Sequence, residues 1–255
     1  MKKIIRKSLL YKSGVEYADF CLNHVEGCSH GCRYPCYAYM MKKRCGRVSG
    51  YEEWCRPKIV GNALELLDRE IPRYQARIKN VQLCFSTDPF MYQQDAVTEL
   101  SLEIIAKLNS HQIPCSILTK GVYPRAILNA NGAGKINKYG ITLVSLDEEF
   151  REHYEPHAAP FSDRIAALRR LHKSGYRTWV SVEPYPTPNI IQQDLVAILE
   201  KVSFVDEVVF GRLNYNAEVS EFKLFRQFYN SQAKIVKEFC KKSRQSLHIK
   251  RGTIG

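Results

Sequence analysis

The sequence has no long hydrophobic run and no segment of low complexity. No apolar stretch approaches the ~20 residues that a membrane-spanning helix requires. The basic start, Met1–Arg6, is not followed by the apolar core of a signal peptide. We therefore expect a cytoplasmic protein that makes no contact with a membrane.

No internal repeat is visible, and no zinc-finger or RNP motif for nucleic acid occurs.

A disulfide framework is also not expected. The chain has nine cysteines, an odd number, and it shows no secretion signal. Reduced thiols with a role in metal binding are the more usual outcome for such a chain.

The composition is that of a globular protein of one or two domains. The 255 residues are 45% hydrophobic and 25% charged, and a chain of this length buries a sizeable core. The formal net charge of +12 suits nucleic acid or another anionic partner. A basic surface that is simply well solvated is the alternative explanation of this charge.

Three cysteines in one loop are the main chemical signal in the sequence. Cys28, Cys32 and Cys36 follow one another at intervals of four, and the glycines and the proline around them disfavour a helix interior. Soft thiolates select zinc, copper(I) or iron–sulfur centres. Three ligands leave one metal position open for chemistry. The alternative is a structural zinc loop, with a fourth ligand from His30, Cys45 or Cys55.

Apolar periodicity alternates between strand and helix along the chain. Short apolar runs predict strands at 17–25, 81–86, 114–120, 140–146, 177–182, 205–210 and 246–250. Amphipathic spacing predicts helices over 57–67, 95–109, 161–174, 190–202 and 221–240, and another from about residue 124. We expect an irregular basic segment at 39–56 and a polar loop from residue 147. Ser162 is expected to cap the helix at 161–174, and Gly175 to end it.

This alternation implies parallel strands joined by helical crossovers, an α/β barrel or partial barrel. Polar residues follow the strand ends, which meet on one face of a barrel, where active sites lie. Six of them suggest a pocket for a polar, anionic substrate. They are Lys120, Arg212, Asn214, Tyr215, His248 and Lys250.

Several segments resemble the motifs of radical S-adenosylmethionine (radical SAM) enzymes. Cys28-Ser-His-Gly-Cys32-Arg-Tyr34, followed by Cys36-Tyr37-Ala38, is similar to their cluster-binding motif, and most of all to that of the branch related to spore photoproduct lyase. Further matches fall in the family's order between about residues 20 and 215. They are Phe85-Ser86-Thr87-Asp88-Pro89-Phe90, Ile117-Leu118-Thr119-Lys120, Ser145-Leu146-Asp147, Tyr154-Glu155-Pro156 with Arg164, and Val182-Glu183-Pro184 with Pro186.

One departure from the family pattern is clear. Pro35 lengthens the usual Cys-x3-Cys-x2-Cys spacing to Cys-x3-Cys-x3-Cys. The additional residue moves the third thiolate relative to Tyr34.

The resemblance implies a partial (β/α)6 barrel of the TIM type. It implies a single domain over 1–255, with a core at about 17–216 and a C-terminal helix and strand at 219–251. The three cysteines would hold three irons of a 4Fe–4S cluster, and S-adenosylmethionine would chelate the fourth. One electron then cleaves the sulfonium and gives a 5′-deoxyadenosyl radical that abstracts hydrogen from a substrate. The expected electron donor is a flavodoxin- or ferredoxin-like protein, and nucleic acid or a nucleotide is the first substrate to test.

The resemblance also assigns cofactor contacts near the cysteine loop. Tyr34 and Tyr37 would pack on the adenine, with simple loop packing as the alternative. Ser86, Thr87 and Asp88 would meet the methionine amino group, since a carboxylate accepts hydrogen bonds from an ammonium. A helix cap or a turn is the alternative for these three residues.

Four further residues are implied as contacts of the cofactor or the substrate. Ser145, Glu155 and Arg164 would reach the ribose and the methionine carboxylate. Arg164 is otherwise a surface charge paired with Asp163 or Glu155. Glu183 would lie near the ribose or the substrate, with a solvated turn as the alternative.

An interpretation of a different class is a non-catalytic iron–sulfur or zinc protein that binds a partner, and Pro35 favours it. Apart from the zinc alternative, Cys45 and Cys55 are expected to be unliganded thiols, with an auxiliary cluster as the other possibility. The remaining cysteines are expected to be small core residues. They are Cys21, Cys84, Cys115 and Cys240.

Overall fold

An eight-stranded sheet forms the centre of the molecule in the computed structural model, which describes all residues except 15, 17 and 130–132. The strand order is β11-β10-β9-β8-β7-β6-β3-β2. Its strands are β2 (Leu10–Lys12), β3 (Phe20–Leu22), β6 (Val81–Leu83), β7 (Cys115–Thr119), β8 (Lys138–Thr142), β9 (Arg177–Tyr185), β10 (Glu207–Arg212) and β11 (Ser246–Ile249). All neighbours are parallel except β2 and β3. Within the described part of the chain β2 does not pair with β11, so the barrel is partial and open.

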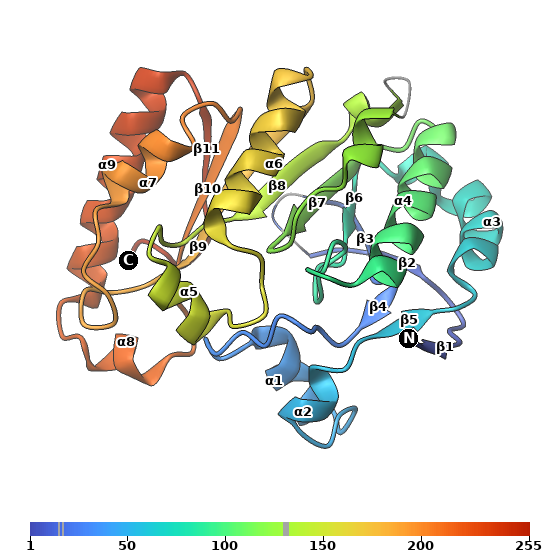
Figure 1. Cartoon of the computed structure of the whole chain (residues 1–255), viewed down its shortest axis with the longest axis horizontal. Coiled ribbons are helices and arrows are strands. Elements are labelled where there is room, and N and C mark those ends of the chain that lie inside the picture. Colours follow the sequence, from blue (N-terminus) through green and yellow to red (C-terminus); the bar gives the residue numbers. More distant parts are fainter. Residues whose placement is uncertain (15, 17, 130–132) are drawn as a thin grey trace.

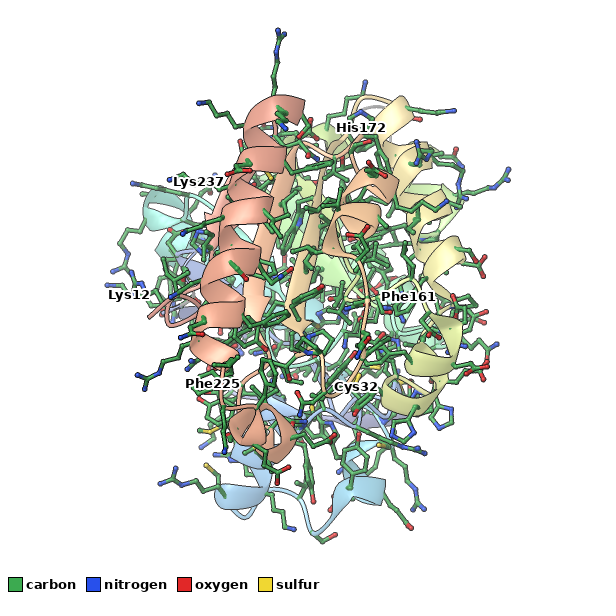
Figure 2. All side chains as sticks on the ribbon, turned by 90° about the vertical axis from the view of Figure 1, so that its left-hand side faces the viewer. Lys12, Cys32, Phe161, His172, Phe225 and Lys237 are labelled. Atoms are coloured by element: carbon green, nitrogen blue, oxygen red, sulfur yellow. The ribbon has the colours of Figure 1, made fainter. Side chains whose placement is uncertain are left out.

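Helices cover the outer face of this sheet (Figure 1). They are α3 (Ala63–Tyr74), α4 (Asp95–Ser110), α6 (Phe161–Lys173), α7 (Leu195–Lys201) and α9 (Phe225–Ser243). In α4 the apolar residues Val97, Ile104, Ile105 and Leu108 are buried and Leu100 is half-buried, so the helix packs this stripe against the sheet. Figure 2 shows Cys32 and Phe225 toward one end of the molecule, and His172 and Lys237 toward the other.

Four shorter helices lie in the lower half of the molecule in Figure 1, α5 and α8 toward the left and α1 and α2 at the bottom. They are α1 (Tyr37–Arg44), α2 (Tyr51–Trp54), α5 (Glu148–Tyr154) and α8 (Ala217–Glu221). A small second sheet lies nearby, with the order β1-β5-β4. Its strands are β1 (Lys2–Ile4), β5 (Lys58–Val60) and β4 (Val25–Glu26).

The predicted alternation of strands and helices is correct, but several segments differ from the prediction. The segment 39–56 contains α1 and α2 rather than an irregular loop. No residue of α1 is buried, so it has no apolar period to detect. The helix predicted from Pro57 begins only at Ala63, because the apolar run before it pairs with β1 and β4 as β5. The strand predicted at 17–25 is divided between β3 and β4, and position 17 lies outside the described residues.

Three further predictions are wrong in detail. The polar loop expected from residue 147 is α5, and the Asp147 carboxylate caps it by accepting from the N–H groups of Glu149 and Phe150. The cap of α6 is Pro160 rather than Ser162, although the helix does end before Gly175, which has φ +79°. The helix expected from residue 124 consists, where it is described, of two 3₁₀ turns. These are η2 (Arg125–Asn129) and η3 (Ala133–Ile136).

The last two predicted helices begin later than expected. The helix at 190–202 is α7, which starts at Leu195, and the helix at 221–240 starts at Phe225. None of the described helices is both long and apolar enough to cross a bilayer.

Candidate active site

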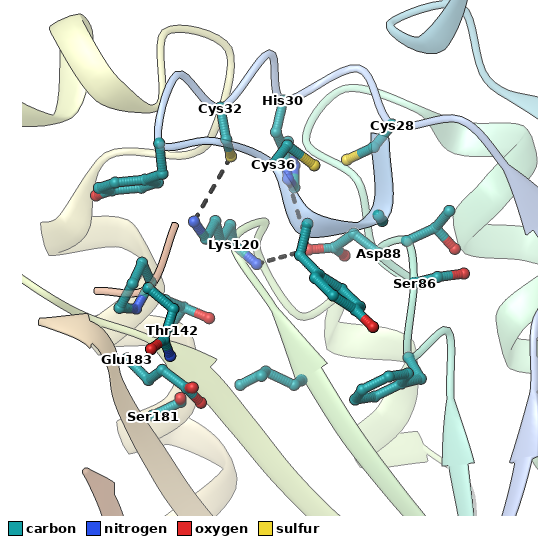
Figure 3. Close-up of a pocket in the computed structure, with 18 of the residues that line it drawn as sticks. Cys28, His30, Cys32, Cys36, Ser86, Asp88, Lys120, Thr142, Ser181 and Glu183 are labelled. Atoms are coloured by element: carbon teal, nitrogen blue, oxygen red, sulfur yellow. Dashed lines mark hydrogen bonds and ion pairs between the residues drawn. The ribbon is translucent and has the colours of Figure 1, made fainter. Parts of the chain in front are cut away.

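A cavity of about 540 Å³ opens where the parallel strands end (Figure 3). Its walls come from the cysteine loop, the loops that follow the strands, and the segment after β11. The residues singled out in the sequence that line it are Cys28, Cys32, Tyr34, Cys36, Tyr37, Ser86, Thr87, Asp88, Lys120, Glu183, Arg212, Asn214, Tyr215 and Lys250. Those that lie outside the lining are Ser145, Glu155, Arg164 and His248.

The backbone holds the cysteine loop in place. The N–H of Cys28 donates to the carbonyl oxygen of Trp54 at 2.9 Å, and the N–H of Arg33 donates to that of Tyr154 at 2.8 Å. Gly27 has φ +85°, and a Cβ at this position would lie 2.6 Å from the Trp54 carbonyl oxygen. The entry to the loop therefore requires glycine.

The three thiols of the loop project into the cavity (Figure 3). All nine cysteines are free thiols. Burial raises the pKa of Cys28, and it raises that of Cys32 to about 11, so a metal must displace both protons. Among the described residues, no three His, Cys, Asp or Glu side chains gather closely enough to hold a single metal ion. Three soft thiolates from one loop are a donor set that suits an iron–sulfur cluster.

His30 lies within the loop but uses both of its ring nitrogens. Nε2 accepts a hydrogen bond from the N–H of Tyr92 at 3.0 Å, and Nδ1 faces Oδ2 of Asp88 at 3.5 Å. The side chain is buried, and burial lowers its pKa to about 4. The ring is therefore neutral with its proton on Nδ1, and no nitrogen remains for the zinc that the alternative interpretation placed here.

The Asp88 carboxylate ties together two walls of the cavity. Oδ1 accepts from the N–H of Phe90 at 2.8 Å and from the Thr119 hydroxyl at 2.7 Å, and Oδ2 accepts from the N–H of Lys120 at 2.7 Å. With His30 also facing it, the carboxylate has little capacity left for a ligand ammonium. Its contact with a cofactor stays a prediction.

The two walls also touch through their backbones. Gly121 follows Lys120 at the end of β7, and a Cβ at position 121 would lie 1.8 Å from the carbonyl oxygen of Phe90. Only glycine allows this approach.

A buried charge cluster lies directly behind the cysteine loop. The Lys120 ammonium is 3.6 Å from the sulfur of Cys32 and 2.6 Å from Oε1 of Glu155. Oε2 of Glu155 is 2.7 Å from Nη2 of Arg164, and neither Glu155 nor Arg164 is exposed. Arg164 is thus paired with Glu155, as one alternative proposed, but it is a core residue and not a surface charge.

Opposite charges set the protonation of this cluster. Burial alone would raise the pKa of Glu155, but the charges of Lys120 and Arg164 outweigh it and lower this pKa to about 2. Burial would lower the pKa of Lys120, whereas the negative charges of Cys32 and Glu155 raise it above its ordinary value. Glu155 and Lys120 therefore both stay ionised at neutral pH.

Two tyrosines of the loop region have different surroundings. Tyr34 is buried against Tyr154, with ring centroids 5.2 Å apart, and its hydroxyl donates to Glu155 at 3.3 Å. Tyr37 is 48% exposed and stacks on Tyr215, which is 68% exposed, with centroids 5.9 Å apart. Tyr34 belongs to the inner wall, and the pair Tyr37–Tyr215 belongs to the mouth of the cavity.

The segment after β6 forms another wall. The Ser86 backbone N–H and hydroxyl both donate to Oδ1 of Asn23 at 3.1 Å, and the Thr87 hydroxyl donates to the Val25 carbonyl at 3.4 Å.

Ser145 is fully buried, and its hydroxyl oxygen accepts from the N–H of Asp147 at 3.1 Å. The predicted contact of Ser145 with a ribose stays a prediction without support from its position.

The inner part of the cavity contains polar residues that the sequence analysis missed. Thr142, Ser181 and Gln82 lie on three different strands and line it. Gln82 is 2% exposed, its Nε2 donates to the Leu83 carbonyl, and its Oε1 has no partner among the described residues. A polar residue inside the apolar run Val81–Leu83 was the one available signal.

A mixed charge cluster forms the rim of the cavity. Glu16 is 2.8 Å from the His248 ring, and Lys250 lies 3.9 Å from Glu183. Burial raises the pKa of Glu183, and the charge of Lys250 opposes this shift. Arg212 adds a further cation, with its Nε donating to Asn214 at 2.6 Å. Glu16 gave no signal in the sequence, because it belongs to no motif or predicted strand.

The cysteines outside the loop differ in burial. Cys21, Cys84, Cys115 and Cys240 are buried, Cys55 is half-buried and Cys45 is exposed. Cys84 lines the cavity, and its S–H donates to Nδ1 of His24 at 3.4 Å, while the other His24 nitrogen donates to Ser101 at 2.7 Å. Cys84 is therefore part of the cavity wall as well as of the core.

The chain is similar to proteins of a known family. Residues 22–202 match the family model described as "Radical SAM superfamily". A protein of Acidianus two-tailed virus, "Uncharacterized protein ORF301", is 24% identical over 204 residues. The match covers 74% of this chain and 64% of the viral protein, so the chain spans less than two thirds of that relative.

Solved structures share the fold. Spore photoproduct lyase complexed with dinucleoside spore photoproduct superposes with a TM-score of 0.66 at 14% identity, over 97% of this chain and 80% of the other. A variant of that enzyme with the same ligand gives a TM-score of 0.70 at 13% identity, with the same coverage. Streptococcus suis SuiB bound to S-adenosylmethionine gives 0.51 at 12% identity, over 72% of this chain and 40% of SuiB. At these identities the likeness concerns the fold alone.

Proposed function

The chain belongs to the radical SAM superfamily and is an enzyme of that class, and from this premise we propose that Cys28, Cys32 and Cys36 bind a 4Fe–4S cluster. We further propose that the adjoining cavity holds S-adenosylmethionine and the substrate. When bound, the cluster and S-adenosylmethionine supply a 5′-deoxyadenosyl radical for hydrogen abstraction. The observation that supports this most is that three free thiols of one loop line the same cavity as the strand-end polar residues.

The residues that line the cavity would do the binding. Tyr34 and Tyr37 offer aromatic surface for an adenine, and Ser86 and Thr87 offer hydroxyls beside the cysteine loop. Glu183 presents a carboxylate on the opposite side, where it would accept from ribose or substrate hydroxyls.

Other residues would support this lining from behind. Asp88 fixes the backbone of Lys120, and Glu155 with Arg164 fixes the Lys120 side chain. Ser145 holds the turn before α5. Their part in binding is to keep the cavity walls in position.

Nucleic acid or a nucleotide is the substrate class that we propose to test first. Three cations line this part of the cavity, Arg212, Lys250 and Arg251. Two carboxylates, those of Glu16 and Glu183, line it as well, so positive charge is in excess. The exposed pair Tyr37–Tyr215 offers ring surface at the mouth for a base to stack on. The similar lyase structures contain a dinucleoside ligand. We also propose that a flavodoxin- or ferredoxin-like protein supplies the electron.

Anaerobic reconstitution tests the proposal. The protein is loaded with iron and sulfide, reduced with dithionite and assayed for 5′-deoxyadenosine after addition of S-adenosylmethionine. We expect product from the native chain and from Cys45→Ala, whose thiol is exposed and outside the cavity. Cys36→Ala should give none.

Two results would contradict the proposal. An intact cluster without cleavage would argue against the radical chemistry. Zinc bound in place of iron would support the alternative, a metal-binding module that recognises a partner.

A further inference from the structure

The outer face of α1 and α2 is strongly basic. The segment 33–58 contains seven Lys and Arg residues against two Glu. Five of the cations are exposed, and together they define what we call the α1–α2 face. They are Arg33, Lys43, Arg44, Arg47 and Arg56.

Most of this charge is not neutralised locally. Lys42 pairs with Glu26 and Lys58 pairs with Glu53, but both lysines are only half-exposed. Arg56 lies 3.8 Å from Glu52 in an ion pair that is open to solvent and therefore weak. Within the described part of the chain, the side chains of Arg33, Arg44 and Arg47 form no ion pair. The face therefore presents a concentrated positive potential to a partner.

The α1–α2 face lies directly over the cysteine loop. Cys36 is the N-cap residue of α1, so the helix continues from the third cysteine without a linker. On the inner side, Trp54 of α2 lines the cavity, and its carbonyl accepts from the N–H of Cys28. In Figure 1 both helices lie at the bottom edge of the molecule, where no other labelled element covers them. A protein docked here would be within a short distance of all three thiols.

The apolar residues of the face distinguish between possible partners. Met40 is 38% exposed and Met41 is 41% exposed. Arg and Met side chains are enriched in protein–protein interfaces, whereas a nucleic-acid backbone gains nothing from exposed methionines. The positive charge then requires an acidic partner.

We propose that the α1–α2 face docks an acidic one-electron donor protein of the flavodoxin or ferredoxin type, an inference that rests on the proposed function. One electron leaves the reduced donor, which is oxidised by one electron, and the cluster held by the loop is reduced by one electron. No proton or group is transferred. The basic face steers the donor and fixes its orientation, and the exposed Met40 and Met41 provide apolar contact.

Charge-reversal variants test the docking surface. The probe is an acidic flavodoxin, and its dissociation constant for the reconstituted protein is measured by fluorescence titration at several salt concentrations. Lys43→Glu with Arg44→Glu and Arg47→Glu should weaken binding by about tenfold or more at low salt and flatten its salt dependence. Arg44→Gln with Arg47→Gln should give a smaller loss in the same direction, and it avoids placing acidic residues at the C-terminal end of α1.

A matched control lies on α9, toward the other end of the molecule (Figure 2). Lys237→Glu with Lys241→Glu and Lys242→Glu reverses three exposed charges there and should change the dissociation constant less than twofold. Equal weakening by both triple variants would overturn the proposal, because net charge and not the α1–α2 face would then set the affinity.

Two further measurements separate this inference from the proposed function. With dithionite as reductant, the α1–α2 variants should form 5′-deoxyadenosine at the native rate. If the native chain itself forms no product with dithionite, the proposed function is wrong, and this result does not depend on the docking surface. A single-stranded oligonucleotide serves as the competing probe. If the α1–α2 variants weaken oligonucleotide binding and leave flavodoxin binding unchanged, the face belongs to nucleic acid and the proposal is wrong.

Discussion

The ammonium nitrogen of Lys120 lies 3.6 Å from the sulfur of Cys32. The contact joins the carboxyl end of β7 to the second cysteine of the loop, and it places a cation beside one sulfur of the three. Hydrogen bonds and positive charge at a ligand sulfur raise the reduction potential of a cluster. Lys120 is therefore positioned to tune any cluster bound by the loop.

Replacing Lys120 should lower that potential. We expect Lys120→Met to shift the midpoint of the reconstituted protein downward by about tens of millivolts, because the cation at the Cys32 sulfur is lost. Spectroelectrochemical titration measures the shift. Lys138→Met is the matched control, since it also removes a half-buried lysine with an acidic partner, Glu207. Lys138 lies at the amino end of β8, whereas Lys120 follows the carboxyl end of β7. An equal shift in both variants would contradict the assignment.

Glu155 should be a major source of stability. Glu155→Gln removes the counter-charge of two cations that are buried or nearly so, Lys120 and Arg164, and loss of one partner of a buried ion pair costs about 3–5 kcal/mol. Urea denaturation at pH 7 measures this loss. A change below about 1 kcal/mol would show that water reaches the cluster of charges and replaces the carboxylate.

The pH dependence of unfolding should identify the same residue. The folded-state pKa of Glu155 is lowered to about 2 from an ordinary 4.5, so its stabilising contribution is complete above pH 4.5 and is lost as the pH falls toward 2. Between these two values the native chain should lose stability more steeply than Glu155→Gln. Parallel curves for the two proteins would mean that another carboxyl group controls acid unfolding.

Asp88 should behave as a structural residue. Asp88→Asn disturbs hydrogen bonds to the N–H groups of Phe90 and Lys120, and bonds to a charged acceptor contribute about 1.5–3 kcal/mol each. We expect the free energy of unfolding of the cofactor-free protein to fall by about 3 kcal/mol. Unchanged stability together with lost binding of S-adenosylmethionine would instead assign Asp88 to the cofactor.

Gln82 should destabilise the ligand-free protein. Its Oε1 is buried and has no hydrogen-bond partner in the part of the chain that the structure describes, and replacing an unsatisfied polar group by an apolar one of similar size is neutral or stabilising. Gln82→Leu should therefore keep or raise the melting temperature. Gln245→Leu serves as the comparison, because its amide donates to the Val202 and Val205 carbonyls and the variant should melt lower. A lower melting temperature for Gln82→Leu would indicate a partner for Oε1, such as a bound water.

The sequence predicted the parts of the site that local patterns encode. The spacing of Cys28, Cys32 and Cys36 marked the loop, and the positions of Lys120 and Glu183 after apolar runs placed both near the strand ends. These predictions succeed because the carboxyl ends of parallel strands must meet. The same reasoning predicted the open α/β barrel and most of its strands.

The remainder depends on tertiary contacts that no local pattern reveals. Glu155 follows the end of α5, and Arg164 lies inside α6. Their neighbours in the sequence do not indicate that this ion pair is buried in the core. Gln82, Thr142 and Ser181 alternate with apolar residues in strands whose two faces are both buried, so side-chain direction was not readable. The helix α1 was missed because a helix without buried residues has no apolar stripe.

Gly121 limits which positions of the cavity can be substituted during evolution. Its lack of a Cβ lets the Phe90 backbone rest against the end of β7, so every larger residue at this position would force the two walls apart. In a library randomised over the cavity, Leu118, Thr142 and Ser181 should accept many replacements among folded clones, whereas position 121 should return glycine alone. Substitutions in the lining can then change the substrate preference, whereas the contact between Gly121 and the Phe90 backbone must be kept.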